Sequence, residues 1–542
     1  MKTENDRKGD YMTKSIKILL IVIISFIFLS LILISFPLSN LKSMKSKNNS
    51  ILLVINADSP INIDGNDELN NTASSGNGTK INPYTIEGLT INDIGVPSIL
   101  IKNTDAYFII IDCYLTKGTR GIEFQNVTNG KILGNQIYSH DIGILINSSQ
   151  NNSIIENDIK YCNDTIFMNN SRNNSLRDNK LIYNNAKSLV LLNSDENWFF
   201  NNSFKDNHYG LILSHSNNNT FDNFFLEDCW ISGYGIYLNN SHGNKFLNSE
   251  ILLHKYCITL YKSDQNTISN ISFPNNAVYS LGIGIQLLNS SFNNITENKI
   301  NLTSYYPIKL TDSPNNVISR NILYKNYYGI TLIRSNLNKI YNNSLNHSVY
   351  RGINLQRSNN SELINNTVFN TAQGYGLDLY RSEFNYLERN NVCLSYSEGL
   401  HLYYAHLNKM FYNNFSNNKY GVWQCYSHNN TYYGNTINNN TIYGIYLQDY
   451  DCYYNNISFN ILHYNNDGIK ISNSNNFLSN NSIINRGPSS TDPTPAPNTP
   501  FPIDQVIFGT NIILSIVGFG LLALIGSIFV IEKRVKLFVC SV

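Results

Sequence analysis

The sequence has few charged residues and no excess of either sign. Among 542 residues there are 39 lysines and arginines and 38 aspartates and glutamates, so the formal net charge is +1 at pH 7. The lysines and arginines form no long runs. Because nucleic-acid binding needs a concentrated positive field, this composition argues against a nucleic-acid partner.

Cysteine is also sparse, and its spacing suggests no paired site. The chain has eight cysteines, none of them in a C-x-x-C pair, which argues against a metal or redox site of that type. They do not recur at one position of the repeat described next, so disulfides between neighbouring turns are not expected. We therefore predict mostly buried single thiols. The cysteines are Cys113, Cys162, Cys229, Cys257, Cys393, Cys425, Cys452 and Cys540.

The most informative feature is an internal repeat, which is seen well in the segment GILINSSQNNSIIENDI that begins at Gly143. With Gly143 as the anchor, equivalent anchors recur every 22–25 residues, apart from one step of 27 residues that ends at Gly284. They are Ser98, Gly121, Gly143, Thr165, Ser188, Gly210, Gly235, Cys257, Gly284, Pro307, Gly329, Gly352, Gly376, Gly399, Gly421, Gly444 and Gly468. A single repeat of this length replaces the three or four globular domains that the chain length would otherwise suggest.

The hydrophobic pattern within the repeat predicts short strands. The residue after each anchor is aliphatic from Ile99 to Ile469, and the residue two further on is apolar except at Gln424. Two more apolar positions follow, as at Ile154 and Ile159. Local alternation broken by turn residues every five to eight positions indicates strands rather than helices.

Asparagine marks the turns. It recurs at one turn position, as at Asn152 and Asn174, where its side chain tolerates left-handed geometry and can hydrogen-bond along a stack. A leucine-rich repeat has a similar period, but it needs L-x-x-L-x-L spacing and a helical or extended return, and this chain has no helical periodicity. We therefore predict an all-β fold, a right-handed parallel β-helix of about 17 turns and roughly 80 Å in length.

The two ends of the chain carry apolar segments. Residues 18–38 contain no charge and are long enough to span a bilayer, and Arg7, Lys8, Lys14 and Lys17 precede them. A second segment, residues 506–531, is followed by the basic tail EKRVK. Positive flanks stay in the cytoplasm, so both segments predict that the repeat lies outside the cell. Alternatively, the first segment is a cleaved secretion signal, with Met12 as the start of translation.

These features give a complete domain organisation. A Pro/Thr/Ser-rich stretch between the repeat and the second apolar segment predicts an extended spacer that lifts the coil off the membrane. The predicted boundaries are a cytoplasmic N-terminus at 1–17, a transmembrane signal-anchor or signal peptide at 18–38, a spacer at 39–50, an N-terminal cap and first turn at 51–97, the parallel β-helix at 98–487, the linker at 488–505, a transmembrane helix at 506–531 and a basic cytoplasmic tail at 532–542.

The repeat also resembles known families. The turn G-I-x-L-x-x-S-x-x-N-x-I-x-x-N-x-I, as in residues 143–159 and 329–345, resembles the parallel β-helix repeat of the NosD-like and carbohydrate-binding and sugar-hydrolase (CASH) families. The opening INIDGNDELNNTASSGNGTKINPYTIEGLTIND is similar to the start of archaeal surface proteins of this group. NosD itself implies periplasmic copper delivery to nitrous oxide reductase, whereas the wider group implies polysaccharide binding or cleavage. The resemblance is specific for the fold rather than for an activity.

The candidate ligand site lies on the outward strand positions of the turns anchored at 376–444. These positions hold Asp378 and Tyr380, His401 and Tyr403, Trp423, and Tyr446, and Arg381 comes one position later. Aromatic faces beside carboxylates and arginines on a flat surface suit sugar rings and acidic sugars. The polar Gln424 at a core position adds to the interest of this region. Alternatively, these tyrosines are simply good strand residues in a tyrosine-rich chain.

Two further hypotheses concern catalysis and copper. A glycosidase needs two carboxyl groups at a defined separation, and Asp378 has His401 rather than a carboxylate at the equivalent position of the next turn. For copper, the best set is Glu383, His406, His428 and Asp451, at one turn position on four successive turns. Solvated turn residues are the simpler interpretation of that set.

The leading hypothesis is therefore a membrane-anchored, extracytoplasmic β-helix that binds carbohydrate or another envelope polymer. A polysaccharide lyase or hydrolase is the first alternative. A NosD-like protein that handles copper, through His406 and His428, is the second, and copper enters only through the family resemblance.

Overall fold

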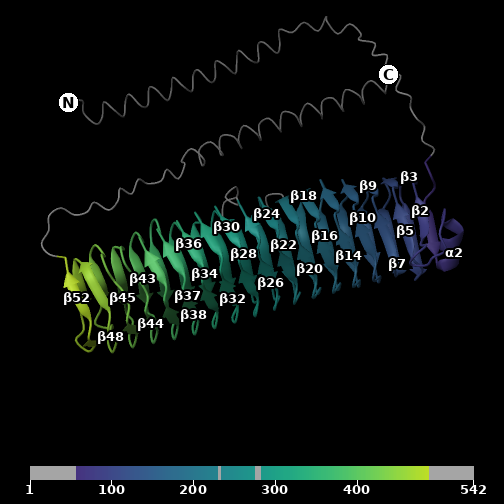
Figure 1. The fold of residues 1–542 in the computed structure, drawn as a ribbon. Helices are drawn as coiled ribbons and strands as arrows, with labels where there is room; N and C mark the ends of the chain where they lie inside the picture. Colours follow the sequence, from purple (N-terminus) through teal and green to yellow (C-terminus); the bar gives the residue numbers. More distant parts are fainter. Residues whose placement is uncertain (1–56, 230–232, 275–281, 487–542) are drawn as a thin grey trace, which may run out of the picture. The chain divides into compact units, whose positions relative to one another are not determined.

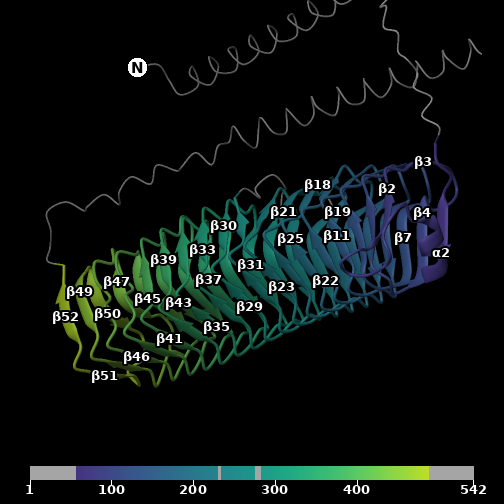
Figure 2. The same ribbon diagram turned by 45° about the vertical axis from the view of Figure 1, so that its right-hand side comes forward.

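The computed structural model describes residues 57–229, 233–274 and 282–486. Over this range the chain is a right-handed parallel β-solenoid of about 17 turns, with strands stacked side by side along one axis (Figures 1 and 2). The predicted fold class is confirmed. Both predicted membrane segments fall outside the described residues. Within those residues, no helix is long and apolar enough to cross a membrane.

Three parallel sheets run along the coil, and each turn contributes one strand to each sheet over most of its length. The first sheet, which contains the strands that follow the anchors, is made of β1 (Ile61–Asp64), β4 (Ile99–Thr104), β7 (Arg120–Val127), β10 (Ile142–Asn147), β13 (Asp164–Asn169), β16 (Lys187–Leu192), β19 (Tyr209–Ser214), β22 (Tyr234–Asn239), β25 (Tyr256–Tyr261), β28 (Ile283–Leu288), β31 (Tyr306–Thr311), β34 (Tyr328–Ile333), β37 (Arg351–Gln356), β40 (Tyr375–Tyr380), β43 (Glu398–Tyr403), β45 (Tyr420–Cys425), β47 (Tyr443–Leu447) and β50 (Asp467–Ile471).

The second sheet follows it in each turn. Its strands are β2 (Tyr84–Glu87), β5 (Phe108–Ile111), β8 (Gly130–Leu133), β11 (Ser153–Ile155), β14 (Ser175–Arg177), β17 (Trp198–Phe200), β20 (Thr220–Asp222), β23 (Lys245–Leu247), β26 (Thr267–Ser269), β29 (Asn294–Thr296), β32 (Val317–Ser319), β35 (Lys339–Tyr341), β38 (Glu362–Ile364), β41 (Tyr386–Glu388), β44 (Lys409–Phe411), β46 (Thr431–Tyr433), β48 (Asn456–Ser458) and β51 (Phe477–Ser479).

The third sheet closes each turn. Its strands are β3 (Thr90–Asn92), β6 (Tyr114–Thr116), β9 (Gln136–Tyr138), β12 (Asp158–Lys160), β15 (Lys180–Ile182), β18 (Ser203–Asn207), β21 (Phe225–Cys229), β24 (Glu250–Leu252), β27 (Ser272–Phe273), β30 (Lys299–Asn301), β33 (Ile322–Tyr324), β36 (Ser344–Asn346), β39 (Thr367–Phe369) and β42 (Asn391–Cys393). Isolated bridges at Asn414 and Thr436 lead on to Ile461, in the pair β49 (Ile461–Asn465) and β52 (Ser482–Asn485).

The register of the first sheet agrees with the anchors read from the sequence. The aliphatic residues that follow the anchors pair strand to strand, for example Ile308 with Ile330 and Ile330 with Ile353. Ile236, Ile285 and Ile330 are each 0% exposed. The predicted inward column is therefore confirmed. It forms because alternation places every second side chain of a strand on the same face.

The asparagines stack as predicted, although their backbone differs from the prediction. The Asn152 side-chain amide donates to Asn174 Oδ1 at 3.1 Å, and that of Asn174 donates to Asn197 Oδ1 at 3.1 Å. These residues are buried, and the left-handed residue is the one before, as at Asn151 with φ of 55°. The buried asparagine keeps this place because its side-chain oxygen also accepts a backbone N–H at the bend, as that of Asn174 does from Asn152 at 3.0 Å.

The structure adds ladders that we did not predict. A second asparagine column runs between the second and third sheets, where the Asn157 amide donates to Asn179 Oδ1 at 3.0 Å. A serine column follows the first sheet, where the Ser149 backbone N–H donates to Ser171 Oγ at 3.1 Å. Both columns supply partners for backbone groups at the corners of the coil.

The N-terminal end is capped by a helix. Helix α2 (Asn66–Thr72) follows β1 and lies at the end of the coil (Figure 1), and its Leu69 is 0% exposed. We expected a cap in residues 51–97 but no helix, because a single buried leucine in seven residues leaves no helical periodicity to detect. The cap covers core side chains that the first turn would otherwise expose.

The six cysteines whose side chains the structure describes are single thiols, as predicted. Cys113, Cys162, Cys257, Cys425 and Cys452 are free and buried, and Cys393 is free and partly exposed. The side chain of Cys229 and all of Cys540 lie outside the described residues. Burial raises the pKa of the Cys113 thiol to about 11, which keeps it protonated and unreactive near neutral pH.

Candidate functional site

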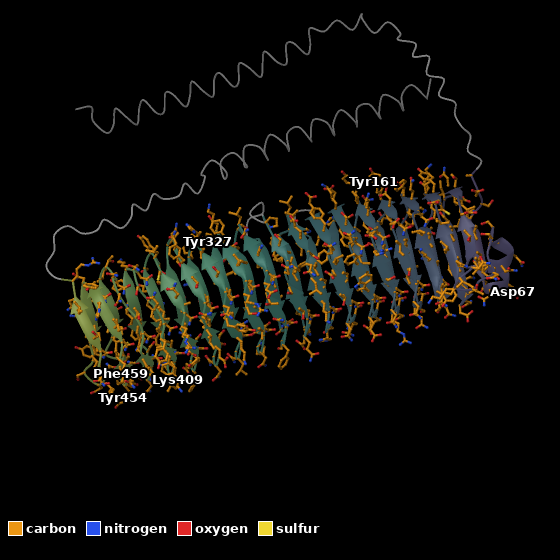
Figure 3. All side chains as sticks on the ribbon, in the orientation of Figure 1. Asp67, Tyr161, Tyr327, Lys409, Tyr454 and Phe459 are labelled. Atoms are coloured by element: carbon orange, nitrogen blue, oxygen red, sulfur yellow. The ribbon has the colours of Figure 1, made fainter. Side chains whose placement is uncertain are left out.

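The predicted ligand residues share one outward face of the first sheet. Side chains project from the coil along its whole length, as the labelled Tyr161 and Tyr327 do (Figure 3). In the C-terminal part Asp378 pairs with His401, His401 with Trp423, and Trp423 with Tyr446. Neighbouring strands are about 4.8 Å apart, so these side chains form one continuous row. We call the outward side of β37, β40, β43, β45 and β47 the ligand face.

A charged network lies at the centre of the ligand face. The Asp378 side chain is 3% exposed, with Arg351 Nε 2.8 Å from Oδ2 and His401 Nδ1 2.8 Å from Oδ1. Both carboxylate oxygens of Asp378 therefore have a partner within the protein. Because a carboxylate only accepts hydrogen bonds, His401 must donate from Nδ1.

Next to this network is a buried carboxyl group. Glu398 is 0% exposed, and within the described part of the chain neither carboxylate oxygen has a hydrogen-bond partner. Burial raises the pKa of Glu398, and the nearby Ser397 hydroxyl and the charge of His401 oppose that shift only in part. Buried and unsatisfied carboxyl groups are rare in natural proteins and concentrate at functional sites.

Aromatic rings surround the charged network. The His401 ring stacks on Tyr375 with centroids 4.4 Å apart, and its centroid lies 6.0 Å from that of Trp423. The Trp423 ring lies 5.2 Å from Tyr420 and 6.2 Å from Tyr446. These rings hold one another in place, so they form a rigid apolar surface.

The ring of Tyr403 extends this surface along the same strands. Tyr380 and Tyr403 stack with centroids 5.6 Å apart and an interplanar angle of 4°. Arg381 lies in the left-handed turn after β40, with φ of 49°, rather than on the strand. Its Cζ is 5.4 Å from the Tyr380 ring and 5.6 Å from the Tyr404 ring, so the cation borders the ligand face.

The arginines that flank Arg381 on earlier turns are arranged differently. Arg334 forms a bidentate pair with Asp312, with both N–O distances at 2.7 Å. Its charge is therefore paired within the protein, so Arg334 needs no ligand to balance it.

Gln424, which we singled out from its polar side chain at a core position, has a structural role. It is 0% exposed, its Nε2 donates to the Ser427 carbonyl at 2.5 Å, and its Oε1 accepts from the Tyr432 hydroxyl. Tyr432 occupies a core position of the second sheet and is itself 0% exposed. The buried hydroxyl needs an acceptor inside the coil, and Gln424 supplies it.

The predicted metal residues His406 and His428 are neighbours, but their geometry does not suit copper. Their rings stack with centroids 3.9 Å apart, so their in-plane lone pairs run side by side and do not converge. His406 Nδ1 accepts the His428 backbone N–H at 3.2 Å, and His428 Nδ1 lies 2.9 Å from Asn429 Nδ2. Among the described residues, no three His, Cys, Asp or Glu side chains come together as a metal site.

Five residues of the ligand face escaped the sequence analysis: Arg351, Tyr375, Glu398, Tyr420 and Tyr443. Each immediately precedes an anchor, and the strands of the first sheet begin at that position. Both the anchor and the residue after it are buried, so the preceding side chain and the one two positions after the anchor emerge on the same side. The recurrence of tyrosine before the anchors, as at Tyr306 and Tyr328, was the signal that could have found this column.

Comparison with known proteins agrees with the fold. The model for the periplasmic copper-binding protein NosD matches residues 157–301, 205–351, 274–420 and 346–491. A model described as right-handed β-helix region matches residues 72–226. A search of the curated proteins found no match.

Several solved structures match the chain at low sequence identity. A mutant of the periplasmic alginate epimerase AlgG is 14% identical, with 72% of this chain and 77% of that chain covered and a TM-score of 0.30. The Dettilon tailspike protein is 15% identical, with 64% and 62% covered and a TM-score of 0.31. The mannuronan C-5 epimerase AlgE6 A-module of Azotobacter vinelandii is 12% identical, with 73% and 92% covered and a TM-score of 0.16.

Likenesses this distant say nothing about the ligand face. The NosD matches, by contrast, overlap to cover residues 157–491 and therefore include every strand of the ligand face. Together with the stacked strands described above, they show that the chain belongs to the NosD-like family of right-handed parallel β-helix proteins.

Proposed function

We propose that this protein is a membrane-anchored cell-surface β-helix whose ligand face binds carbohydrate or another envelope polymer. The observation that carries the proposal is the packed row of rings on one rigid face, with Trp423 between Tyr420 and Tyr446. Aromatic rings bury the apolar face of a sugar without loss of its hydroxyl hydrogen bonds at the rim.

The shape of the face favours an extended ligand. The rings repeat from strand to strand at about 4.8 Å along the coil, so the surface is a strip and not a closed pocket. Arg351 is partly exposed, with 31% of its side chain accessible, and Arg381 borders the same strip. Two guanidinium groups beside the rings favour a polymer that carries carboxylate groups.

The location rests on sequence and family. The apolar segments 18–38 and 506–531, with their basic flanks, place the coil outside the membrane. The family model describes a periplasmic protein, which agrees with an extracytoplasmic coil. Protease added to intact cells should remove the coil and spare the tail at 532–542. Digestion of that tail from outside would contradict this topology.

Binding is tested with the full chain on immobilised polysaccharides, including polygalacturonate, alginate and hyaluronan. Trp423→Ala and Tyr403→Ala should each weaken binding by about tenfold to a hundredfold, equivalent to about 1–3 kcal/mol, because a stacking ring is lost. Tyr237→Ala is the matched control, since Tyr237 occupies the position of Trp423 on β22 and stacks on Tyr234 at 4.9 Å. Equal effects of all three variants would indicate non-specific binding along the coil.

A further inference from the structure

The charged network is more elaborate than a stacking surface needs. Rings alone hold a sugar, whereas burial of the Asp378 carboxylate costs desolvation free energy that only its bonds to Arg351 and His401 offset. Glu398 adds a second buried carboxyl group with no hydrogen-bond partner among the described residues. The simplest reason for such buried charged groups on an outward face is that they prepare His401 to take part in a reaction.

We propose that His401 Nε2 is a general base that removes a carbon-bound proton beside a carboxylate of an acidic polysaccharide. This inference rests on the proposed function, because the polymer must first bind to the ligand face. It adds a reaction to that binding, with His401 and Arg351 as the catalytic residues and Asp378 as a positioning residue.

The geometry prepares His401 for this role. Donation from Nδ1 to Asp378 at 2.8 Å leaves the lone pair on Nε2, and no described residue forms a hydrogen bond with Nε2. Stacking on Tyr375 at 4.4 Å fixes the plane of the ring, and the side chain is 13% exposed. A carboxylate on the far nitrogen also stabilises the imidazolium that forms when the base takes a proton.

Arg351 determines the class of substrate. Its Nε is used by Asp378, which leaves the two terminal nitrogens as a fork for a second carboxylate. The proton next to a sugar carboxylate is removable only if the charge that develops on that carboxylate is stabilised. Arg351 is one strand from Asp378 and two from His401, so the fork and the base lie on the same short stretch of the face.

Glycosidic hydrolysis fits this site less well. That reaction uses two carboxyl groups that flank the scissile bond. Asp378 is 3% exposed with both oxygens occupied, and Glu398 is 0% exposed. Neither carboxyl group on this part of the described face reaches a bound sugar, whereas His401 does reach the surface.

The reaction balances without an oxidant or a metal. The C–H bond beside the carboxylate breaks, the proton moves to His401 Nε2, and the electron pair passes into the carboxylate held by Arg351. The pair then forms a C=C bond as the neighbouring C–O bond to the next sugar breaks. The departing oxygen takes a proton from water, and His401 returns its proton to water.

Glu398 is a further positioning residue, since it is too deeply buried to meet the substrate. The titratable and charged groups that face His401 are Asp378 and Arg351 through the network, Glu398 and Tyr375 beside it, and Lys419 near Glu398. Asp378 is the group in direct contact with the imidazole, so its removal has the clearest effect on how His401 is held.

The test uses the full chain with polygalacturonate, alginate and hyaluronan. The expected result is new unsaturated chain ends, detected by ultraviolet absorbance. His401→Gln should reduce the rate of their formation by about a hundredfold or more while binding changes little. Tyr237→Ala, far along the coil, should leave that rate unchanged.

Asp378→Asn separates positioning from a structural role. The variant should have a lower kcat with little change in KM, because the amide still fills the position but no longer fixes the Nδ1–H tautomer of His401. An unchanged kcat, or a loss of rate that only follows a loss of folded protein in thermal unfolding, would overturn this role of Asp378.

The outcomes of the parent assay separate the two proposals. Binding without new unsaturated chain ends would overturn the general base and leave the proposed function intact. Absence of binding to all three polymers would overturn both. Equal rates for the parent and His401→Gln would exclude His401 as the base.

Discussion

The plain face at β10–β19 and the ligand face at β37–β47 have the same interior and different exteriors. In both, the residue after the anchor is 0% exposed, as at Ile144 and Leu400. The outward position two after the anchor holds Leu145, Phe167, Val190 and Ile212 in the plain face, and Asp378, His401, Trp423 and Tyr446 in the ligand face. The repeat fixes which side chains point inward, whereas the outward side chains can differ in chemical type from turn to turn.

The largest effect should come from the shared interior. Ile144→Asp and Leu400→Asp each bury an unpaired charge in a column that is 0% exposed, and each should cost more than about 4 kcal/mol in free energy of unfolding. Urea denaturation would measure it. Leu145→Asp, one residue along and partly exposed, should cost far less. A large difference between the first two variants would mean that the two regions do not share one core.

The asparagine ladder should give the next largest effect. Asn174→Ala removes the acceptor for the Asn152 backbone N–H, and Asn408→Ala removes that for Asn385, at distances of 3.0 and 2.9 Å. Each buried donor left unpaired should cost about 1–3 kcal/mol. Asn163→Ala is the control, because Asn163 is exposed and its amide donates only to Asp141, at 3.3 Å. Thermal unfolding of the three variants would compare the regions, and a ladder variant as stable as the control would contradict the prediction.

Acid should destabilise the N-terminal region. Burial lowers the pKa of His140 from 6.5 to about 4, so the unfolded chain binds the proton more tightly than the folded chain. The stabilisation is full above about pH 6.5 and is lost as the pH falls through about 4. Hydrogen-exchange protection near β9, measured relative to the intrinsic rate at each pH, should therefore fall on acidification, and His140→Gln should reduce that change.

The pH dependence of stability that Glu398 contributes should be opposite in sign to that of His140 and the smallest of these effects. Burial raises the pKa of its carboxyl group above the ordinary 4.5, so its contribution is full below that value and is lost as the pH rises through the folded pKa. Hydrogen-exchange protection near β43, measured relative to the intrinsic rate at each pH, should fall as the pH rises from acidic toward neutral, and Glu398→Gln should flatten that dependence. A steeper dependence in the variant would show that Glu398 is ionised and paired.

The parts of the fold that repeat were predictable from the chain. Position-by-position recurrence at Ile236, Ile285 and Ile330 identified the inward column, and it also gave the register between neighbouring strands. Helix α2 and Gln424 were missed or misinterpreted because each occurs once. A single departure from a repeat has no second instance that shows whether it serves packing or function.

The sequence alone determined the coil, its register and the row that contains His401, Trp423 and Tyr446, because periodic burial needs only the alternation of side chains along a strand. The tertiary structure decided what those residues can do. The bend at each anchor turns the preceding residue outward, which brings Arg351, Tyr375 and Glu398 onto the face and closes the Arg351–Asp378–His401 network. That network joins residues 23 and more positions apart in the chain, so only stacking of the turns could create it.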